Sequence, residues 1–188
     1  MLAQAARLVQ PVSAERDHLR GPDAALVTLV EYGDYECPHC RAANPVIDEV
    51  IGAMKSDVRF VYRHFPLTQT HPHGMEAAQA AELAGSHGLF WEMHDMLFSH
   101  QDALGTPDLV RHAAQLGLDA ASFARALATH SHAARVREDF VSGVRSGVNG
   151  TPTFFVDGLR YDGPRDFQSL MAALDEAARR NALQLRPR

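Results

Sequence analysis

The chain has 188 residues, of which 46% are hydrophobic and 22% are charged, and its formal net charge at neutral pH is −5. This length and composition suit a soluble globular protein with one hydrophobic core, or with one core and a substantial insertion. The negative charge argues against a nucleic-acid partner, which would need a basic surface facing its phosphates. No apolar run approaches the roughly 20 residues that span a bilayer, so no membrane partner is expected either.

Residues 1–22 are expected to form an N-terminal arm that ends at the turn signal Gly21-Pro22. Within it, residues 1–13 contain no convincing apolar segment of a signal peptide. The sequence as it stands therefore predicts a cytoplasmic protein. A periplasmic or exported protein whose leader had been removed would show the same pattern.

A βαβ unit is predicted next. Residues 24–33 form a continuous apolar run rich in β-branched side chains, which is typical of a strand buried on both faces. A helix should follow from Pro38 to about Ser56, with a kink at Pro45, and residues 57–62 read as a second strand. Strands joined by a helix in this way should be parallel. The side chains expected on the buried face of the helix are Val46, Val50, Ile51 and Met54.

Residues 68–131 are predicted to form an all-helical insertion. Helix-forming segments alternate there with turn signals, such as the break at residues 85–88. A new helix should open near Gly105, with Thr106 as its N-cap ahead of Pro107. The block is long for a simple connection and has apolar residues of its own.

The remainder of the chain is predicted to complete an α/β domain. A helix over residues 133–147 leads back to a strand over residues 151–157, and Asp157-Gly158 is a hairpin turn into a short strand. A last amphipathic helix runs from Asp166 to Arg180. The predicted parts are an arm (1–22), a discontinuous α/β domain (23–67 and 132–184), the helical insertion (68–131) and a C-terminal tail (185–188).

Cys37 and Cys40 are the only cysteines and lie three positions apart. Such a pair closes almost no loop, so it would stabilise the fold little and suits chemistry better than architecture. The pair falls where a strand gives way to a helix. Side chains at i and i+3 of a helix lie about 5–6 Å apart, but a residue just before the first turn is free of helical dihedrals. Cys37 can therefore approach Cys40 closely enough for a disulfide.

The same position should make Cys37 reactive. A helix N-terminus presents unpaired N–H groups and a partial positive charge, which favour a thiolate, and His39 adds an imidazole that does the same when protonated. Such surroundings lower a cysteine pKa from about 8.5 into the range of roughly 3.5–7.5. Cys37 is then the attacking thiolate, and Cys40 is the resolving thiol.

Two other interpretations of the cysteines stay open. They could be an inert buried pair, or half of a zinc site, although no motif supplies the other two ligands. His71 and His73, on either side of Pro72, could form a separate metal pair. Neither metal site is the leading interpretation, and no metal or added cofactor is expected beyond the redox-active disulfide.

The segment Val27–Cys40, with its tetrapeptide Cys37-Pro38-His39-Cys40, resembles the active-site region of bacterial DsbA-like thiol–disulfide oxidoreductases of the thioredoxin superfamily. The resemblance extends over about residues 20–180. It implies an α/β thioredoxin fold with an all-helical domain inserted between the βαβ half and the ββα half. Other segments that carry it are Arg63–Leu67, His71–His73, Phe90–His94 and Gly147–Val156.

Three further site residues follow from this resemblance. Pro152 matches the family's cis-proline beside the disulfide, the alternative being a trans proline at a strand edge, and Thr151 would present backbone groups to an extended substrate. Glu31 matches a buried acid that shuttles a proton to and from Cys40. A surface glutamate, or one paired with a Lys or Arg, is the alternative for Glu31.

The sequence also departs from the family. Relatives carry an aromatic residue before the first cysteine, whereas this chain has Glu36, with Asp34 close by. Both carboxylates should oppose the Cys37 thiolate, because nearby negative charge disfavours it. The redox potential of the pair is therefore open.

The predicted function is thiol–disulfide exchange with cysteine-containing protein or peptide substrates, and with a redox partner protein or glutathione. The direction (oxidase, reductase or isomerase) and the oligomeric state are not determined by the sequence. One alternative is a glutathione-dependent transferase or isomerase of the same fold. Another is a redox-sensing or chaperone-like peptide-binding module.

Overall fold

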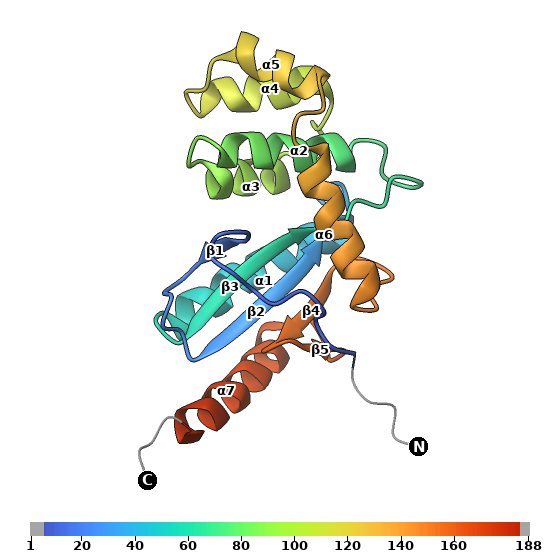
Figure 1. Cartoon of the computed structure of the whole chain (residues 1–188). Helices are drawn as coiled ribbons and strands as arrows, with labels where there is room; N and C mark the ends of the chain where they lie inside the picture. The colour runs from blue at the N-terminus through green and yellow to red at the C-terminus, as the bar shows by residue number, and fades with distance from the viewer. Residues whose placement is uncertain (1–5, 185–188) are drawn as a thin grey trace.

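The strand predicted before the cysteines is the centre of the fold. The computed structural model describes residues 6–184, and in it the five strands of one sheet are ordered β1-β3-β2-β4-β5 (Figure 1). β2 and β3 are parallel and in register from Val27 against Val58 to Gly33 against His64, which confirms the predicted βαβ unit. The strands are β1 (His18–Arg20), β2 (Val27–Gly33), β3 (Val58–His64), β4 (Thr153–Val156) and β5 (Leu159–Tyr161).

Helix α1 (Pro38–Met54) connects the two parallel strands and begins at the predicted proline. Its buried residues follow the 3–4 spacing of an amphipathic helix: Cys40, Ala43, Ile47, Val50 and Met54. The prediction that Val46 lies on the buried face was wrong by one position. Ile47 is buried and Val46 is only half-buried, because the buried positions continue in steps of three and four from Cys40 and Ala43 to Ile47.

Both faces of the sheet are covered (Figure 1). α1 and the last helix, α7 (Phe167–Gln184), pack against the face that presents Leu29 and Phe60. α6 (Ala133–Arg145) and part of the N-terminal arm cover the other face, on which Val30 and Phe155 lie. The strand predicted to be buried on both sides is therefore buried on both sides.

The insertion is entirely helical, as predicted, and confirms the fold class. It stacks above the sheet as two layers, α2 with α3 and α4 with α5 (Figure 1). Its helices are α2 (Gly74–Gly85), α3 (Phe90–Ser99), α4 (Thr106–Gln115), α5 (Ala120–Ala128) and α6. The predicted N-cap of α4 was wrong: Gly105 takes that position, and the hydroxyl of Thr106 donates to Glu76 at 2.8 Å. The exact domain limits stay predictions.

The N-terminal arm is more structured than the sequence indicated. Residues 18–20 form β1, which pairs antiparallel with β3, and residues 8 and 12 pack on the sheet face that α6 covers. Three residues are too short a run for a strand to stand out by hydrophobic pattern. The predicted tail, residues 185–188, lies outside the described residues.

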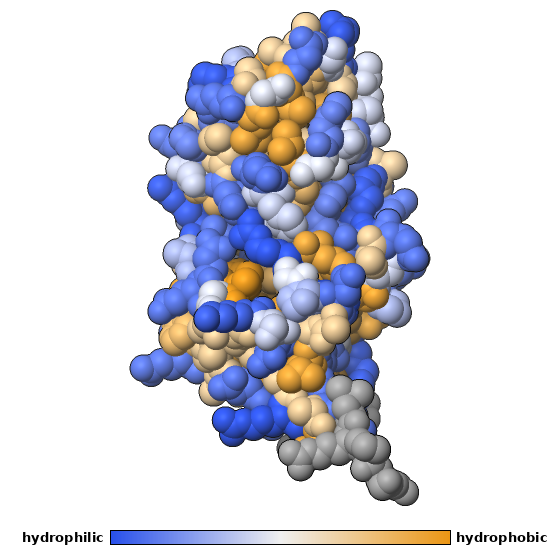
Figure 2. All heavy atoms as spheres, turned by 90° about the vertical axis from the view of Figure 1, so that its left-hand side faces the viewer, coloured by the Kyte–Doolittle hydropathy of each residue, from blue (hydrophilic) through white to orange (hydrophobic). Residues whose placement is uncertain are grey.

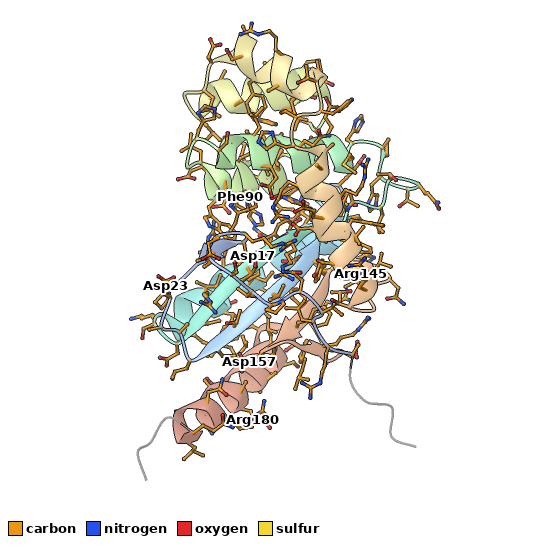
Figure 3. All side chains as sticks on the ribbon, viewed as in Figure 1. Asp17, Asp23, Phe90, Arg145, Asp157 and Arg180 are labelled. Atoms are coloured by element: carbon orange, nitrogen blue, oxygen red, sulfur yellow. The ribbon has the colours of Figure 1, made fainter. Side chains whose placement is uncertain are left out.

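A buried ion pair attaches the arm to the sheet. β3 runs two residues further than predicted, and Arg63 near its end is fully buried. Its guanidinium donates to both carboxylate oxygens of Asp17 at 2.9 Å and to the hydroxyl of Tyr32 at 3.0 Å. Burial raises the pKa of Asp17, but the hydrogen bonds and charge of Arg63, together with the backbone N–H of Ser13 and the charge of Arg16, hold this pKa below its usual value. Figure 3 shows Asp17 on the arm, in front of the sheet.

No helix within residues 6–184 is long and apolar enough to cross a membrane. The face shown in Figure 2 is mostly hydrophilic, and its hydrophobic atoms gather in small separate areas rather than in one band.

The substitution Asp17→Asn tests the ion pair, because it leaves Arg63 buried without its main counter-charge. Breaking one partner of a buried pair costs about 3–5 kcal/mol, so we expect a loss of that size in the free energy of unfolding, measured by urea denaturation. Asp23→Asn is the matched control on an exposed carboxylate (Figure 3) and should change stability by less than about 0.5 kcal/mol. Equal, small effects of both substitutions would contradict the assigned role of Asp17.

Candidate active site

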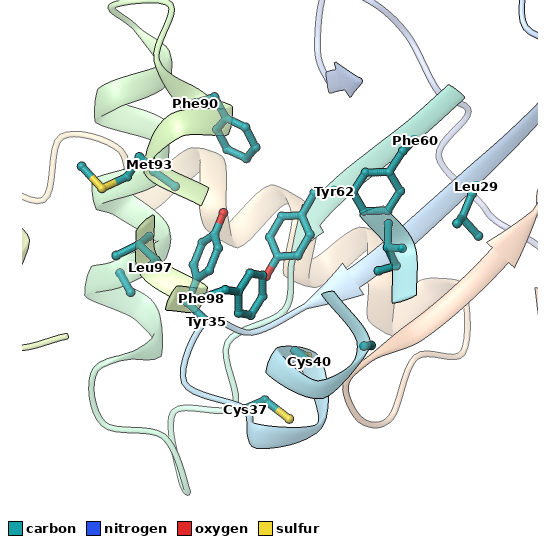
Figure 4. Close-up of a cluster of buried hydrophobic side chains, with 14 of the residues drawn as sticks. Leu29, Tyr35, Cys37, Cys40, Phe60, Tyr62, Phe90, Met93, Leu97 and Phe98 are labelled. Carbon is teal, nitrogen blue, oxygen red and sulfur yellow. The ribbon is translucent and has the colours of Figure 1, made fainter. Parts of the chain in front are cut away.

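The cysteine pair lies at the N-terminus of α1. Cys37 is the N-cap residue with extended dihedrals (φ −76°, ψ 121°), and Pro38 occupies the first turn. The side chains of Cys37 and Cys40 are buried, both as free thiols, whereas Pro38 and His39 between them are exposed. Figure 4 shows Cys37 at the start of the helix and Cys40 on the following turn. The structure thus brings the two sulfurs together as the sequence predicted.

The surroundings of Cys37 favour its thiolate and lower its pKa from 9.0 to about 5. The hydrogen bond from the Cys40 thiol is the largest cause, and burial opposes it. The hydroxyl of Thr151 and the backbone N–H groups of Cys40 and His39 contribute further. This Thr151 hydroxyl is buried and has no hydrogen-bond partner among residues 6–184, so it is free to donate to the thiolate. His39 thus acts through its backbone, while its ring faces solvent.

Cys40 has the opposite character. Burial raises the pKa of Cys40 well above its ordinary value, and its bond to Cys37 and the charge of Glu31 raise it further. The backbone N–H of Asp34, which donates to the Cys40 sulfur at 3.5 Å, opposes this only in part. At neutral pH the pair therefore holds one thiolate, on Cys37, and one thiol, on Cys40.

Glu31 is buried in β2, with 1% of its surface exposed. Burial, followed by the charge of Cys37, raises the pKa of Glu31 to about 8, while Arg165 lowers it slightly. Its Oε1 atom has no hydrogen-bond partner among the described residues. Glu31 is thus neither a surface glutamate nor part of a close ion pair, and its carboxyl group is able to exchange a proton near pH 8.

The loop before β4 closes the site from the other side. The peptide bond between Thr151 and Pro152 is cis, and both residues are buried. When Cys37 is protonated, its thiol donates a hydrogen bond to the carbonyl oxygen of Thr151 at 3.5 Å. Segments more than a hundred residues apart in the chain therefore meet at Cys37.

The two acidic residues before Cys37 bind the loop that follows β3. Asp34 is buried, and its Oδ2 accepts hydrogen bonds from the backbone N–H of Leu67 at 2.8 Å and from Nδ1 of His71 at 2.7 Å. Glu36 accepts from the backbone N–H of His73 at 2.6 Å. Each carboxylate is therefore engaged with a donor of the loop 67–73.

The predicted opposition of Asp34 and Glu36 to the Cys37 thiolate does not prevail, since the pKa of Cys37 is lowered despite them. Both carboxylates accept hydrogen bonds from the loop 67–73 instead.

The same contact bears on the predicted metal pair of His71 and His73. The Nδ1 atom of His71 is hydrogen-bonded to Asp34, and no group of three or more potential ligands within residues 6–184 includes His71 or His73.

One group of potential metal ligands is present in the described part of the chain, formed by the buried side chains of His64, Glu82 and Asp139. Both carboxylates already have cationic or hydrogen-bonding partners, so we assign the cluster to charge pairing between β3, α2 and α6. These partners are His18 and His64 for Glu82, and Arg16 and Arg135 for Asp139. The cysteine pair belongs to no such group among residues 6–184, and the zinc interpretation lacks its further ligands.

Sequence reasoning missed two residues that hold the active-site loop. The Tyr35 ring stacks on Tyr62 with centroids 5.2 Å apart (Figure 4), and its hydroxyl lies 3.1 Å from Nδ1 of His94. Gln101, after α3, donates from Nε2 to the carbonyl oxygens of Tyr35 at 2.7 Å and Cys37 at 2.9 Å. A lone glutamine in a connection carries no motif, so no sequence signal could have singled it out.

The comparison with known proteins agrees with this arrangement. The sequence model of the family described as Thioredoxin (Thioredoxin_4) matches residues 13–176. The chain belongs to this family. Its fold is similar to that of BdbD from Bacillus subtilis in its oxidised crystal structure, with 23% identity, a TM-score of 0.82 and coverage of 94% of this chain and 98% of that one. It is also similar to a thioredoxin-like oxidoreductase from Silicibacter pomeroyi, with 27% identity, a TM-score of 0.75 and coverage of 91% and 94%.

Among curated sequences, this thioredoxin-family chain is similar to part of much longer proteins. It is 48% identical over 170 residues to the Na(+)/H(+) antiporter NhaA 3 of Salinispora tropica, which is 90% of this chain but 26% of that relative. The chain thus spans about a quarter of the length of the curated relatives it matches.

A titration of thiolate absorbance at 240 nm tests the electrostatics of the cysteine pair. The reduced protein should show one step near pH 5, which Cys37→Ala abolishes, and no further cysteine step below pH 9. In Cys40→Ala the step should move to higher pH, because the largest cause of the lowered Cys37 pKa is removed. A single step near pH 9 in the wild-type protein would contradict the assigned environment of Cys37.

Proposed function

We propose that the chain is a thiol–disulfide oxidoreductase that exchanges the Cys37–Cys40 disulfide with protein thiols. The observation that carries this proposal is the asymmetry of the pair: a stabilised thiolate at the N-cap of α1 beside a buried thiol one turn later. In an inert buried pair, burial would raise both cysteine pKa values, whereas the pKa of Cys37 lies about four units below its ordinary value. Membership of the thioredoxin family supports the same activity.

The reaction proceeds through a mixed disulfide. A substrate thiolate attacks the sulfur of Cys37, the Cys37–Cys40 bond breaks, and Cys40 leaves as a thiolate. A second substrate thiolate then attacks the substrate sulfur of the mixed disulfide and releases Cys37 as a thiolate. Two electrons pass from the substrate thiols to the pair, the substrate gains a disulfide, and every step is reversible.

Glu31 is the proton donor and acceptor for Cys40 in this scheme. With a pKa of about 8, it is mostly protonated at neutral pH and can neutralise the Cys40 thiolate as it leaves. In the reverse direction, the ionised Glu31 takes the proton back and turns Cys40 into a nucleophile. This assignment is supported by its burial and by the unpaired Oε1 atom.

The substrate is a cysteine-containing protein segment in extended conformation. The Thr151 backbone, next to Cys37 in the loop before β4, is suited to pair with such a segment as an added strand. Contact through backbone groups tolerates many side chains, so we expect a broad range of substrates. DsbA-like proteins act on cysteine-containing protein substrates. Oxidised glutathione or a protein disulfide would reoxidise the Cys37–Cys40 pair after each turnover.

The equilibrium redox potential in glutathione buffers is the decisive measurement. A stabilised Cys37 thiolate favours the reduced form, so we expect an oxidising pair with a potential between about −120 and −180 mV. Cys40→Ala should accumulate a mixed disulfide with a peptide substrate, and Cys37→Ala should not. A value near −270 mV would make the protein a reductant, and no exchange at any ratio of reduced to oxidised glutathione would overturn the proposed function.

Glu31→Gln tests the proton transfer. The amide keeps the shape of the carboxyl group but cannot exchange a proton, so the rate of substrate oxidation at pH 7 should fall by about tenfold to 10²-fold. In the wild-type protein this rate should decline as the pH rises through about 8, because Glu31 loses its proton there, and the variant should lack that decline. The matched control is Glu49→Gln, on the exposed face of α1, which should keep the wild-type rate and pH profile.

A further inference from the structure

Gln101 connects the helical insertion to the reactive cysteine. It follows α3 in the chain, is half-buried, and lies 64 positions from Cys37. Its side-chain amide donates both of its hydrogen bonds to the active-site loop, to the carbonyl oxygens of Tyr35 and Cys37. No titratable side chain takes part in this contact.

The two carbonyl groups lie on either side of Glu36, in the segment that carries the chain from β2 into α1. Among residues 6–184, the Tyr35 carbonyl accepts its hydrogen bond from the amide of Gln101. The Cys37 carbonyl also accepts the first hydrogen bond of α1, from the backbone N–H of Arg41 at 3.1 Å. Gln101 is thus a second donor to the carbonyl group of the reactive residue itself.

A donor at this carbonyl acts on the sulfur in two ways. It fixes the backbone of the N-cap residue, so that the sulfur stays over the free N–H groups of the first turn. It also withdraws negative charge from an oxygen in the same residue as the thiolate, and in a buried setting such charges interact strongly. Both effects favour the ionised sulfur over the thiol.

The Tyr35 side chain strengthens this coupling. Its ring lies in the aromatic cluster between the sheet and the insertion, where it packs against Tyr62 and Phe98 (Figure 4) and against His94. The insertion therefore holds the loop by a ring on one side and by the Gln101 amide on the other. A shift of α3 relative to the sheet would move both contacts at once.

We propose that Gln101 is a positioning residue that sets the reactivity of the Cys37 thiolate from the helical insertion, through its hydrogen bonds to the carbonyl groups of Tyr35 and Cys37. This inference rests on the proposed exchange function and names a determinant of its potential. The helical insertion then contributes a residue that tunes the redox centre, in addition to packing against it.

Three substitutions of Gln101 test the inference by their sign. Gln101→Leu removes the donors and should raise the Cys37 pKa by about one unit, measured by absorbance at 240 nm. That shift is a tenfold loss of preference for the reduced form, which corresponds to a potential about 30 mV lower. Gln101→Glu replaces donors with negative charge and should raise the pKa further. Gln101→Lys keeps donors and adds positive charge, so its pKa should equal or lie below that of the wild-type protein.

Gln115→Leu is the matched control, the same substitution at an exposed glutamine of the insertion, and should leave the pKa and the potential unchanged. A merely structural role would lower the melting temperature in all three Gln101 variants without ordering their pKa values by charge. Wild-type pKa and potential in all three variants would overturn the inference. If the wild-type protein does not exchange with glutathione, the proposed function fails, while the pKa series still decides the role of Gln101.

Discussion

The passage from β2 to α1 is the constraint around which the molecule is organised. β2 is buried on both faces and paired on both edges, and the chain must leave it and begin a helix within a few residues. Cys37 stands where the extended backbone ends, so its sulfur faces the unpaired N–H groups of the first turn. The cis Thr151–Pro152 loop, the buried Glu31 and the Gln101 amide are all arranged around this one residue.

Charge placement explains how a thiolate is stable so near to three acidic residues. Asp34 and Glu36 are bound to the loop 67–73, which supplies donors for their charge. Glu31 is kept mostly neutral by its burial, so it does not repel the thiolate at neutral pH. The sequence places three acidic residues near Cys37. In the tertiary structure two of them are hydrogen-bonded to the loop 67–73, and the third is mostly neutral.

The interface between sheet and insertion is held by paired charges as well as by apolar contacts. Arg63 binds the N-terminal arm through Asp17, and Glu82 and Asp139 connect α2 and α6 to the end of β3. Buried ion pairs contribute little net stability, but removing one partner is costly. These pairs therefore fix the relative position of arm, sheet and insertion, and with it the contact of Gln101 with the active-site loop.

The sequence by itself determined the cysteine motif at a strand-to-helix junction, the parallel β2–β3 pair and the helical character of the insertion, because these features depend on local spacing and hydrophobic periodicity. It left β1, the phase of α1 at Ile47 and the partners of Asp34 and Glu36 to the folded state. The family resemblance had already implied that the Thr151–Pro152 loop lies beside the disulfide. Only the tertiary structure brought Gln101 to Cys37 and Asp17 to Arg63. Those contacts join residues far apart in the chain. Their hydrogen bonds and their burial form only after the segments have packed together, so local sequence patterns do not reveal them.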